Sequence, residues 1–492
     1  MSNNPSDLKA RILELTAEYS RLVHSNSSPE GNSSWQSGDP IPYAARVFSQ
    51  EEVVAAVSSS LDFWLTLGEH GSNFESNFSS YLGVNKSLLV NSGSSANLLA
   101  LSALTSHRLP IDKRLLPGDE VITVACGFPT TVAPIVQVGA VPVFIDINPK
   151  TFNPLLDSLK LSFAPGKTKA VVFAHALGNP FDLHTVLQFC RDNELWLIED
   201  NCDSLGSTYS LDVHLANRLG FTTNSPGLPE TPGYITRYTG TWGDISTQSF
   251  YPPHHITTGE GGMVNICSNS LLSRIIESFR DWGRDCWCPS GVDNSCNKRF
   301  DWSLGDLPVG YDHKYIYSHL GFNLKPLDIQ AAIGSVQLTR LPSFVAQRQK
   351  NWNYLRTHLD ELSAFLEFSL PTHATSWSPT SGFKWESDHA LVSPSWFGFS
   401  LSLKDVSHRR PLAQFLDSHK VGNRAFFAGN LIRQPAFTQL KLQKPGAYRV
   451  IGSLDNSDYV MNRSLFVGTY PGLTSSMLDH EISLLKSYFS TI

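Results

Sequence analysis

The sequence feature that most constrains the fold is an alternation of apolar, strand-like runs with helical stretches, which begins near Ser87. Six such runs follow one another along the chain: SLLVNSG, GDEVITVAC, VPVFID, AVVFAHA, LWLIEDN and STQSFYP. Alternation of this kind is typical of a largely parallel sheet that is covered by helices on both faces. Ligands of such sheets bind beyond the carboxyl ends of the strands, so the residues that follow each run are the candidate site residues.

The length of the chain predicts more than one domain, because single cores stop growing near ~250–300 residues and this chain has 492. We expect a helical segment and connector over residues 1–70, a large domain over 71–341 and a smaller α+β domain over 342–492. The connector is the Ser/Asn/Gly/Pro-rich stretch from Ser25 to Pro42. A second irregular segment, from Leu211 to Ile235, is predicted to be a long inserted loop.

Composition excludes several classes of partner. The chain is 41% hydrophobic and 17% charged, which is typical of a globular protein, and its net charge of −6 gives no attraction to nucleic acid or to an acidic membrane surface. The N-terminus interleaves charged and apolar residues, unlike a signal peptide, and no apolar run reaches the ~18–20 residues of a membrane span. We therefore expect a cytoplasmic protein with neither a nucleic-acid nor a membrane partner.

Small residues follow the first apolar run, in the stretch NSGSSAN from Asn91 to Asn97. A turn of small residues that opens a helix presents backbone N–H groups and a positive dipole end to an anion. Gly93, Ser94 and Ser95 are therefore candidates for holding a phosphate. The alternative interpretation is an ordinary Ser/Asn helix cap.

Two further strand ends carry candidate residues. Asp200 closes the run LWLI, and a carboxylate there is expensive to desolvate unless it meets a cation or hydrogen-bond donors. It can pair with a protonated heterocyclic nitrogen, although helix capping is the alternative. Phe128 follows another run and can stack on a flat ring, although a place in the core is its alternative.

Together these residues, with the blocks GDEVITVACGFPTTVAPIVQVGAVPVFIDINP, IEDNCDSLGS, GDISTQSFYPPHHITTGEGG and LGFNLKPLDIQAAIG, resemble the DegT/StrS family of sugar aminotransferases. The resemblance implies an α/β protein with the fold of PLP-dependent transferases (aspartate aminotransferase-like, fold type I), a large, mainly parallel sheet domain, and a homodimer. It also implies a cofactor contact for each of several residues: ring stacking by Phe128, the pyridine nitrogen with Asp200, O3′ with Asp203, the phosphate with Ser94, Ser95 and Ser249, and Asn323 from the partner subunit.

The same resemblance draws attention to His254. Aminotransferases of the family have at this position the lysine that binds pyridoxal phosphate as a Schiff base, and this chain has no lysine between Lys169 and Lys298. Imidazole cannot form that imine, but it can transfer protons near neutral pH. Pyridoxamine phosphate would then remain untethered and form a ketimine with a ketone of the substrate. Proton removal by His254 would expel a β-hydroxyl group, which is dehydration.

This substitution and the blocks IPYAARVFSQEEV, SLDFWLTLGEHG, NSGSSANLLALSALTS and NRAFFAGNLIRQPAF resemble the 3-dehydrase subgroup of the family. The resemblance implies a lyase that removes the C-3 hydroxyl of a nucleotide-linked 4-keto-6-deoxyhexose in dideoxyhexose and lipopolysaccharide O-antigen biosynthesis. CDP-4-keto-6-deoxyglucose is the favoured substrate, and a TDP-linked sugar is the alternative. Arg424 and Arg433 lie in the last block and are candidates for the pyrophosphate, because guanidinium groups match phosphate geometry.

Three of the seven cysteines form a C-x-C-x7-C pattern of Cys286, Cys288 and Cys296. Three clustered cysteines alone more often indicate structural zinc. The subgroup resemblance implies instead a [2Fe–2S] cluster with Cys202 as fourth ligand, reduced by an NADH-dependent flavin and iron–sulfur reductase. The segment from Leu211 to Ile235 makes the gap after Cys202 wider than the subgroup leads us to expect.

Two other functions stay open on the sequence alone. A sugar aminotransferase would require the missing lysine, and a catalytically silent relative would serve as a scaffold. The retained cofactor residues and the patterned cysteines favour the dehydrase.

Overall fold

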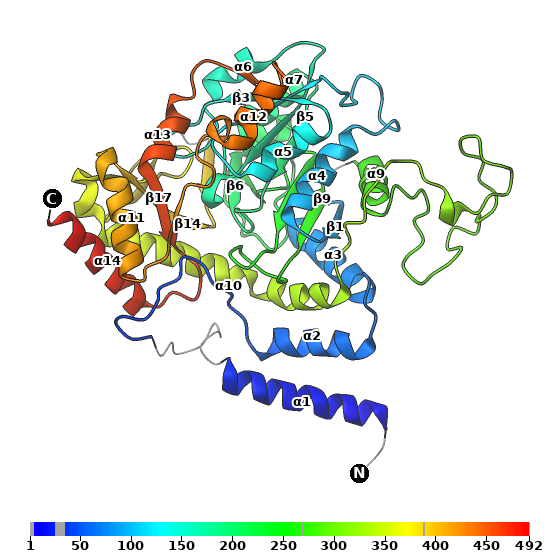
Figure 1. Ribbon diagram of the computed structural model, residues 1–492, viewed down its shortest axis with the longest axis horizontal. Helices are drawn as coiled ribbons and strands as arrows, with labels where there is room; N and C mark the ends of the chain where they lie inside the picture. The colour runs from blue at the N-terminus through cyan, green and yellow to red at the C-terminus, as the bar shows by residue number, and fades with distance from the viewer. Residues whose placement is uncertain (1–3, 25–34, 268, 387–388, 492) are drawn as a thin grey trace.

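An eight-stranded sheet forms the centre of the protein (Figure 1), in the order β1-β9-β8-β5-β4-β2-β3-β16. The computed structural model describes residues 4–24, 35–267, 269–386 and 389–491. The strands of the central sheet are β1 Lys86–Val90, β2 Glu120–Val124, β3 Val141–Ile145, β4 Thr168–Ala174, β5 Trp196–Asp200, β8 Ile245–Ser249, β9 Gly262–Ile266 and β16 Arg449–Val450. All pairs from β8 to β16 are parallel, whereas β9 is antiparallel to both its neighbours. The predicted, mainly parallel sheet is confirmed, and each of the six apolar runs forms one of its strands.

Helices cover both faces of this sheet, because successive side chains of its buried strands point to opposite sides. On β2, Val121 packs into the cluster beneath one helical layer and Ile122 into the cluster beneath the other. The first layer consists of α4 Gly93–Leu104, α5 Pro129–Gln137 and α9 Ser270–Arg280, and the second contains α6 Leu159–Ser162 and α7 Leu183–Asp192. The carboxyl ends of the parallel strands thus open toward one edge between two covered faces.

The long helix α10, Asp328–His358, packs against α2, Gln50–Asp62, and α3, Glu69–Leu82, and α1, Pro5–Val23, packs on α2 (Figure 1). The predicted domain boundary at residue 341 falls inside α10, and the predicted connector lies partly outside the described residues, over 25–34. In the described part of the chain, no helix is both long and apolar enough to cross a membrane.

A smaller mixed α+β region follows α10, as predicted. Its four-stranded sheet has the order β10-β14-β17-β15, and a separate hairpin pairs β11 with β12. The elements are β10 Leu366–Glu367, β11 Ala374–Ser378, β12 Gly382–Trp385, β14 Gly398–Leu403, α11 Arg409–Ser418, β15 Asn423–Ala425, α12 Pro435–Gln443, α13 Asp455–Arg463, β17 Ser464–Gly468 and α14 Ser475–Phe489. The region is joined to the central sheet, because β16 pairs with β3.

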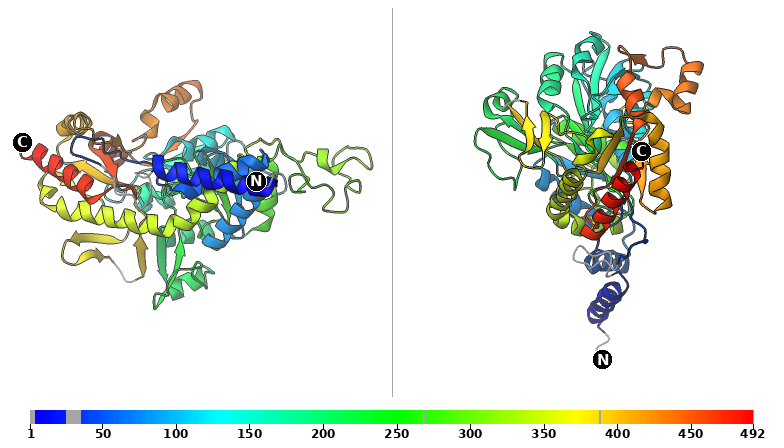
Figure 2. Two further views of the ribbon diagram at one scale, coloured as in Figure 1. Left: turned by 90° about the horizontal axis from the view of Figure 1, so that it is seen from below. Right: turned by 90° about the vertical axis from the view of Figure 1, so that its left-hand side faces the viewer.

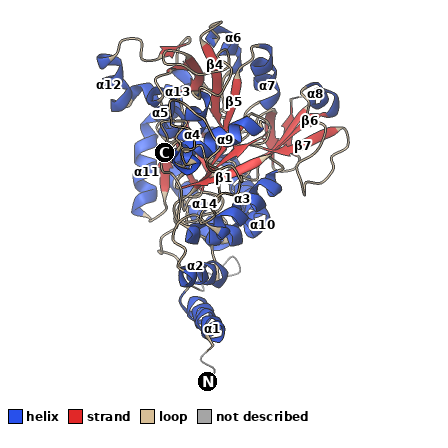
Figure 3. Cartoon of the chain, turned by 90° about the vertical axis from the view of Figure 1, so that its right-hand side faces the viewer, coloured by secondary structure: helices blue, strands red, loops and turns tan. Residues whose placement is uncertain are grey.

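The segment from Leu211 to Ile235 is not the long loop that the sequence predicted. It includes the end of β6, Thr208–Asp212, then α8, Val213–Arg218, and the start of β7, Tyr234–Tyr238. These strands form a three-stranded sheet with β13, Ala390–Ser393, at the side of the molecule (Figure 3). The prediction was wrong because the turn-rich stretch SPGLPETPG occupies only the connection between two paired strands.

Residues 284–320, here called the arm, extend away from the body of the protein (Figures 1 and 2). The arm contains one short 3-10 turn, His313–Tyr315, and no α-helix or β-strand. Its root is fixed by Asp285, which forms an ion pair with Arg108 and a hydrogen bond with Nε2 of His313 at 3.1 Å. Side chains farther along the arm are exposed, including Val309 at 94% and Leu320 at 96%.

Candidate active site

A cavity of about 850 Å³ opens at the carboxyl ends of the parallel strands. The residues that line it come from the ends of six strands of the central sheet and the loops that follow them, from the C-terminal region and from Tyr43. Among them are nine of the residues predicted from the sequence: Gly93, Ser94, Phe128, Asp200, Cys202, Asp203, Ser249, His254 and Arg424. The structure therefore brings most of the predicted site together, and the role of each residue stays a prediction.

Asp200 ends β5 and is held firmly by donors. Its carboxylate, only 4% exposed, accepts hydrogen bonds from Thr131 Oγ1 at 2.6 Å, from Asn97 Nδ2 at 2.9 Å and from the backbone N–H of Cys202 at 3.2 Å. Donors of this kind offset the cost of burying a charged carboxylate. Asp200 fits the partner of a protonated ring nitrogen, and Thr131 and Asn97 are site residues that the sequence interpretation missed.

The residues predicted to hold a phosphate at the N-terminus of α4 differ in whether they cap the helix or line the cavity. Ser95 takes part in the helix cap: its backbone N–H donates to Ser92 Oγ at 3.1 Å and its hydroxyl donates to Asn91 Oδ1 at 2.6 Å. Ser95 does not line the cavity, whereas the exposed side chain of Ser94 does. The capping alternative therefore holds for Ser92 and Ser95, and Ser94 remains available to an anion.

Gly93 allows the start of α4 to approach the end of β8 closely. A Cβ atom on Gly93 would lie 2.6 Å from Cβ of Ser249 and 3.2 Å from Sγ of Cys202. Because these contacts are so short, any side chain at this position would displace its neighbours. The backbone N–H groups of α4 and the hydroxyl groups of Ser94 and Ser249 thus meet at one wall of the cavity, in an arrangement that fits a phosphate.

His254 lies in the turn between β8 and β9, at the wall of the cavity. Its Nδ1 is buried without a hydrogen-bond partner in the described part of the chain, and Oδ1 of Asp203 lies 3.5 Å away. Burial, followed by the charge of Arg348, lowers the pKa of His254 to about 4. Burial, with the charge of Asp200 acting in the same direction, raises the pKa of Asp203 to about 8. Both side chains are therefore neutral near pH 7.

The neighbouring His255 points into the protein. It is buried, and its Nε2 donates to the backbone carbonyl of Ser395 at 2.7 Å. This bond gives His255 the hydrogen-bonding role in packing, and no lysine lines the cavity among the residues that the structure describes. His254 is the imidazole that faces the cavity.

Aromatic side chains surround the mouth of the cavity. Phe128 is 51% exposed and meets the ring of Phe427 edge-on at 6.1 Å between centroids, so it is not part of the core. The guanidinium of Arg424 lies over the ring of Tyr43 at 4.3 Å, and both residues line the cavity. A flat ring can therefore enter between apolar faces beside one cationic group.

Two predicted residues lie outside this cavity. Arg433 is turned toward Asp458, with which its Nη2 forms an ion pair at 2.8 Å. The exposed Asn323, which pairs through its backbone with Asp281, does not line the cavity of its own chain. The expected contribution of Asn323 to the site of a partner subunit stays a prediction.

The three clustered cysteines lie on the arm. Cys286, Cys288 and Cys296 line one small cavity, and Ser295 Oγ donates to Cys288 Sγ at 3.1 Å. Burial alone would raise the pKa of Cys288, but hydrogen bonds from Ser295 and Cys286 lower it. Thiolates are ligands suited to zinc or to an iron–sulfur cluster.

Cys202 does not join the arm cysteines in this structure. Its Sγ lies in the cofactor cavity beside Gly93, where burial, with the charge of Asp200, holds its pKa well above the ordinary value. Among the described residues, no three or more His, Cys, Asp or Glu side chains form a ready group for a metal ion. The arm thiols suit a cluster chemically, but the four predicted ligands are not assembled.

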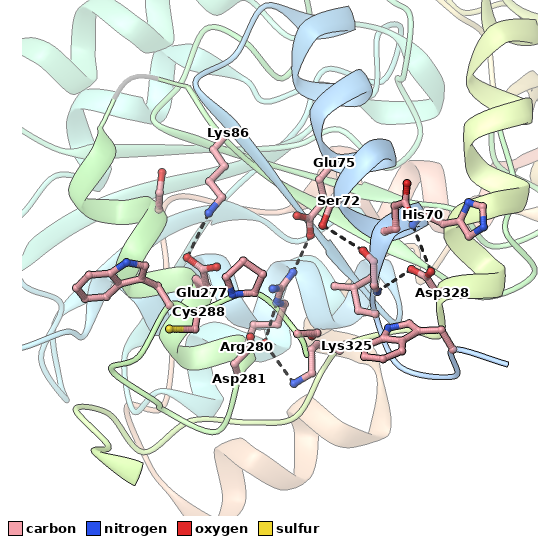
Figure 4. A pocket seen from close by; sticks show the side chains of 18 of the residues that line it. His70, Ser72, Glu75, Lys86, Glu277, Arg280, Asp281, Cys288, Lys325 and Asp328 are labelled. Carbon is pink, nitrogen blue, oxygen red and sulfur yellow. Dashed lines mark hydrogen bonds and ion pairs between the residues drawn. The ribbon is translucent and has the colours of Figure 1, made fainter. Parts of the chain in front are cut away.

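A second cavity, of about 960 Å³, lies between the arm, α3 and α9 (Figure 4). Cys288 forms part of its wall. Its charged side chains pair with one another, as in the ion pairs of Arg280 with Glu75 at 2.7 Å and of Lys86 with Glu277 at 3.2 Å. These ion pairs join α3 and β1 to α9. The charged side chains are therefore accounted for by their contacts with one another, without a ligand.

Comparison with known proteins decides the family. The model of the DegT/DnrJ/EryC1/StrS aminotransferase family matches residues 48–486. The chain belongs to this family. The DegT-family proteins similar to it include the "lipopolysaccharide biosynthesis protein RfbH" of Salmonella typhimurium, which is 44% identical over 98% of each chain. Another is a dTDP-4-dehydro-2,6-dideoxy-D-glucose 3-dehydratase of Saccharopolyspora spinosa, 43% identical over 98% of this chain and 92% of the relative.

Solved structures agree with this DegT-family assignment. GDP-4-keto-6-deoxy-D-mannose-3-dehydratase of E. coli with bound hydrated PLP has a TM-score of 0.71 and 26% sequence identity, over 90% of this chain and 98% of that structure. The predicted fold of PLP-dependent transferases is confirmed.

Proposed function

We propose that this DegT-family chain is a pyridoxamine-phosphate-dependent 3-dehydrase that removes the C-3 hydroxyl of a nucleotide-linked 4-keto-6-deoxyhexose. The observation that carries the proposal is His254, which faces the cofactor cavity at the position where family aminotransferases have a lysine. The names of the relatives as 3-dehydratases of nucleotide-linked sugars support it. CDP is the nucleotide we favour.

The cavity fits the cofactor at three points. Asp200 suits the ring nitrogen, Phe128 can cover a face of the ring, and the wall at Gly93, Ser94 and Ser249 suits the phosphate. Pyridoxamine phosphate, when bound, supplies an amine that condenses with the substrate ketone and a ring that accepts electrons. Arg424, above Tyr43 at the mouth, is placed for the substrate pyrophosphate.

The protonation state of His254 leaves its imidazole free to accept a proton. Its imidazole is neutral at neutral pH because its pKa is about 4, and the same low pKa makes it a weaker base than a free imidazole. Asp203, 3.5 Å from Nδ1 and with a pKa near 8, carries no negative charge that would favour the imidazolium. The pair therefore keeps the imidazole free of a proton until the substrate arrives.

Dehydration without an amino donor tests this assignment. Mass spectrometry should detect loss of water from CDP-4-keto-6-deoxyglucose when only pyridoxamine phosphate is added. His254→Asn should lower the rate by about 10²–10⁴, the usual contribution of a general base. His255→Asn should retain activity, because that side chain faces Ser395. Transfer of an amino group by the wild-type protein, or an active His254→Asn, contradicts the proposal.

We also propose that the arm cysteines bind a [2Fe–2S] cluster, which supplies single-electron transfer from an NADH-dependent flavin and iron–sulfur reductase. Cys286, Cys288 and Cys296 would be three ligands, and Cys202 the fourth. Because Cys202 lines a different cavity, its ligation would require the arm to move over the mouth. Structural zinc on the arm is the alternative.

Metal analysis of anaerobically purified protein distinguishes the two. About two iron and two sulfide per chain support the cluster. Cys202→Ala should lower the iron content, whereas Cys190→Ala, which removes a buried thiol of α7, should not. Zinc in place of iron, or iron content unaffected by Cys202→Ala, contradicts the proposed ligand set.

A further inference from the structure

A buried arginine lies directly behind the turn that carries His254. Arg348 projects from the middle of α10 and is only 1% exposed. Its Nη2 lies 3.2 Å from the carbonyl oxygen of His254 and 3.3 Å from that of Pro253, and its Nη1 lies 3.2 Å from that of Trp396 and 3.4 Å from that of Phe397. A buried guanidinium is costly unless its donors are satisfied, and here backbone carbonyls accept from both Nη groups, whereas Nε has no partner among the described residues.

These carbonyls belong to two separate walls of the cavity. Pro253 and His254 lie in the turn after β8, whereas Trp396 and Phe397 lead into β14. The ring of Phe397 lies 5.4 Å from that of His254, so the two segments meet beside the imidazole. The planar guanidinium fork can bond both segments at once, which the single ammonium of a lysine cannot match.

We propose that Arg348 is a positioning residue for His254: its guanidinium fastens the His254 turn to the Trp396–Phe397 wall. The proposal rests on the proposed function only in that His254 is taken as the base. Arg348 touches neither cofactor nor substrate cavity in this arrangement and acts through the backbone of His254.

The hydrogen bonds make this role measurable, because they join two segments that are far apart in the sequence. Without the guanidinium, four backbone carbonyls lose a donor, so the turn of His254 and the Trp396–Phe397 segment should open more often. The backbone amides of both segments should then exchange with deuterium faster.

Hydrogen–deuterium exchange of the cofactor-free protein, followed by mass spectrometry, tests the proposal. Arg348→Gln should raise the exchange rates of the peptides that contain His254 and Phe397 by about tenfold, because hydrogen bonds to a charged group are lost. Arg348→Lys, whose ammonium cannot bond both segments equally well, should raise them less. Arg356→Gln is the matched control: this arginine is also buried on α10, but it pairs with Asp360, so both peptides should keep the wild-type exchange rates.

Unchanged exchange in a folded Arg348→Gln protein overturns the proposal, as does an equal rise in Arg356→Gln. If Arg348→Gln does not fold, wild-type exchange in Arg348→Lys overturns it instead. With substrate, Arg348→Gln should lower kcat and leave KM nearly unchanged, because Arg348 does not line the cavity; a change in KM alone overturns the positioning role. The exchange measurement needs no substrate. Dehydration that survives His254→Asn would defeat the proposed function and leave the exchange result standing, so the two failures are distinguishable.

Discussion

The pKa of His254 lies below the usual value for histidine, and the pKa of Asp203 lies above the usual value for aspartate. A free imidazole has a pKa of about 6.5 and a free aspartate one of about 3.9. In the cavity the values are about 4 for His254 and about 8 for Asp203, chiefly because burial disfavours the charged form of each. The cavity wall therefore offers a neutral base and a neutral acid side by side at the pH of the cell.

Asp203→Asn should change the pH dependence of stability. The folded protein keeps the Asp203 proton up to about pH 8, whereas the unfolded chain loses it near 3.8. Stability from this group is thus fully present below pH 3.8 and is lost as the pH rises toward 8. The amide does not titrate, so the variant should gain stability relative to wild type between pH 5 and pH 8. Urea unfolding of cofactor-free protein at the two pH values measures this, and an unchanged difference contradicts it.

At the residue scale the sequence located the site but not every partner. Phe128, Asp200 and Ser249 line one cavity because the carboxyl ends of parallel strands meet at one edge of the sheet, and their contacts with a cofactor stay predictions. Arg433 lies outside the cavity because it forms an ion pair with Asp458, a contact that the local sequence does not reveal. Arg348 was missed because an arginine within a helical pattern is usually solvated.

At the scale of elements, the contact between α4 and β8 depends on a glycine, Gly93, whose lack of a side chain lets the two elements lie close together. Gly93→Ala would place a methyl group 2.6 Å from Ser249 Cβ and push the helix start away from the strand. We expect a loss of about 1–3 kcal/mol of stability and weaker pyridoxal phosphate binding. Thermal unfolding and a fluorescence titration measure the two effects. Gly127→Ala, at a cavity position where an added Cβ meets no atom within 4 Å, should change stability and cofactor binding little. Equal effects of the two substitutions would contradict the role of close contact at Gly93.

A second inter-element contact joins α10 to α3. The buried carboxylate of Asp328 accepts the backbone N–H groups of Gly68 at 2.7 Å, His70 at 3.2 Å and Gly71 at 2.8 Å. Asp328→Ala leaves these donors unpaired, so it should lower the free energy of unfolding by about 2–4 kcal/mol. Asp328→Asn keeps an acceptor and should cost less in the same urea titration. An alanine variant as stable as wild type would refute this capping role.

The strands of the central sheet were predictable because each is a short apolar run bounded by turn residues. The strands β6 and β7 were not, because they form a sheet with β13, which lies nearly two hundred residues farther along the chain: Thr208 of β6 pairs with Ser393 of β13. A partner so distant leaves no local pattern, whereas the SPGLPETPG turn is conspicuous.

At the scale of the whole molecule, we expect a homodimer with shared sites. Asn323 lies outside the cavity of its own chain, just beyond an arm whose Leu320 is 96% exposed. Light scattering should give twice the chain mass of 54.4 kDa. His254→Asn and Asn323→Ala should each be inactive, yet unfolding and refolding them together should restore about a quarter of wild-type activity, because half the dimers then hold one intact site. A monomer, or no recovery in the mixture, contradicts this arrangement.

Helix α10 runs without interruption for 31 residues and bonds to three separate parts of the molecule through Asp328, Arg348 and Asn351. This helix ties the turn of His254 and the Trp396–Phe397 segment to one axis, so the two segments cannot separate by hinge rotation unless α10 itself bends. We expect the width of the cavity to change mainly through rotation of side chains at its mouth, such as Phe128 and Arg424, and little through movement of these two segments.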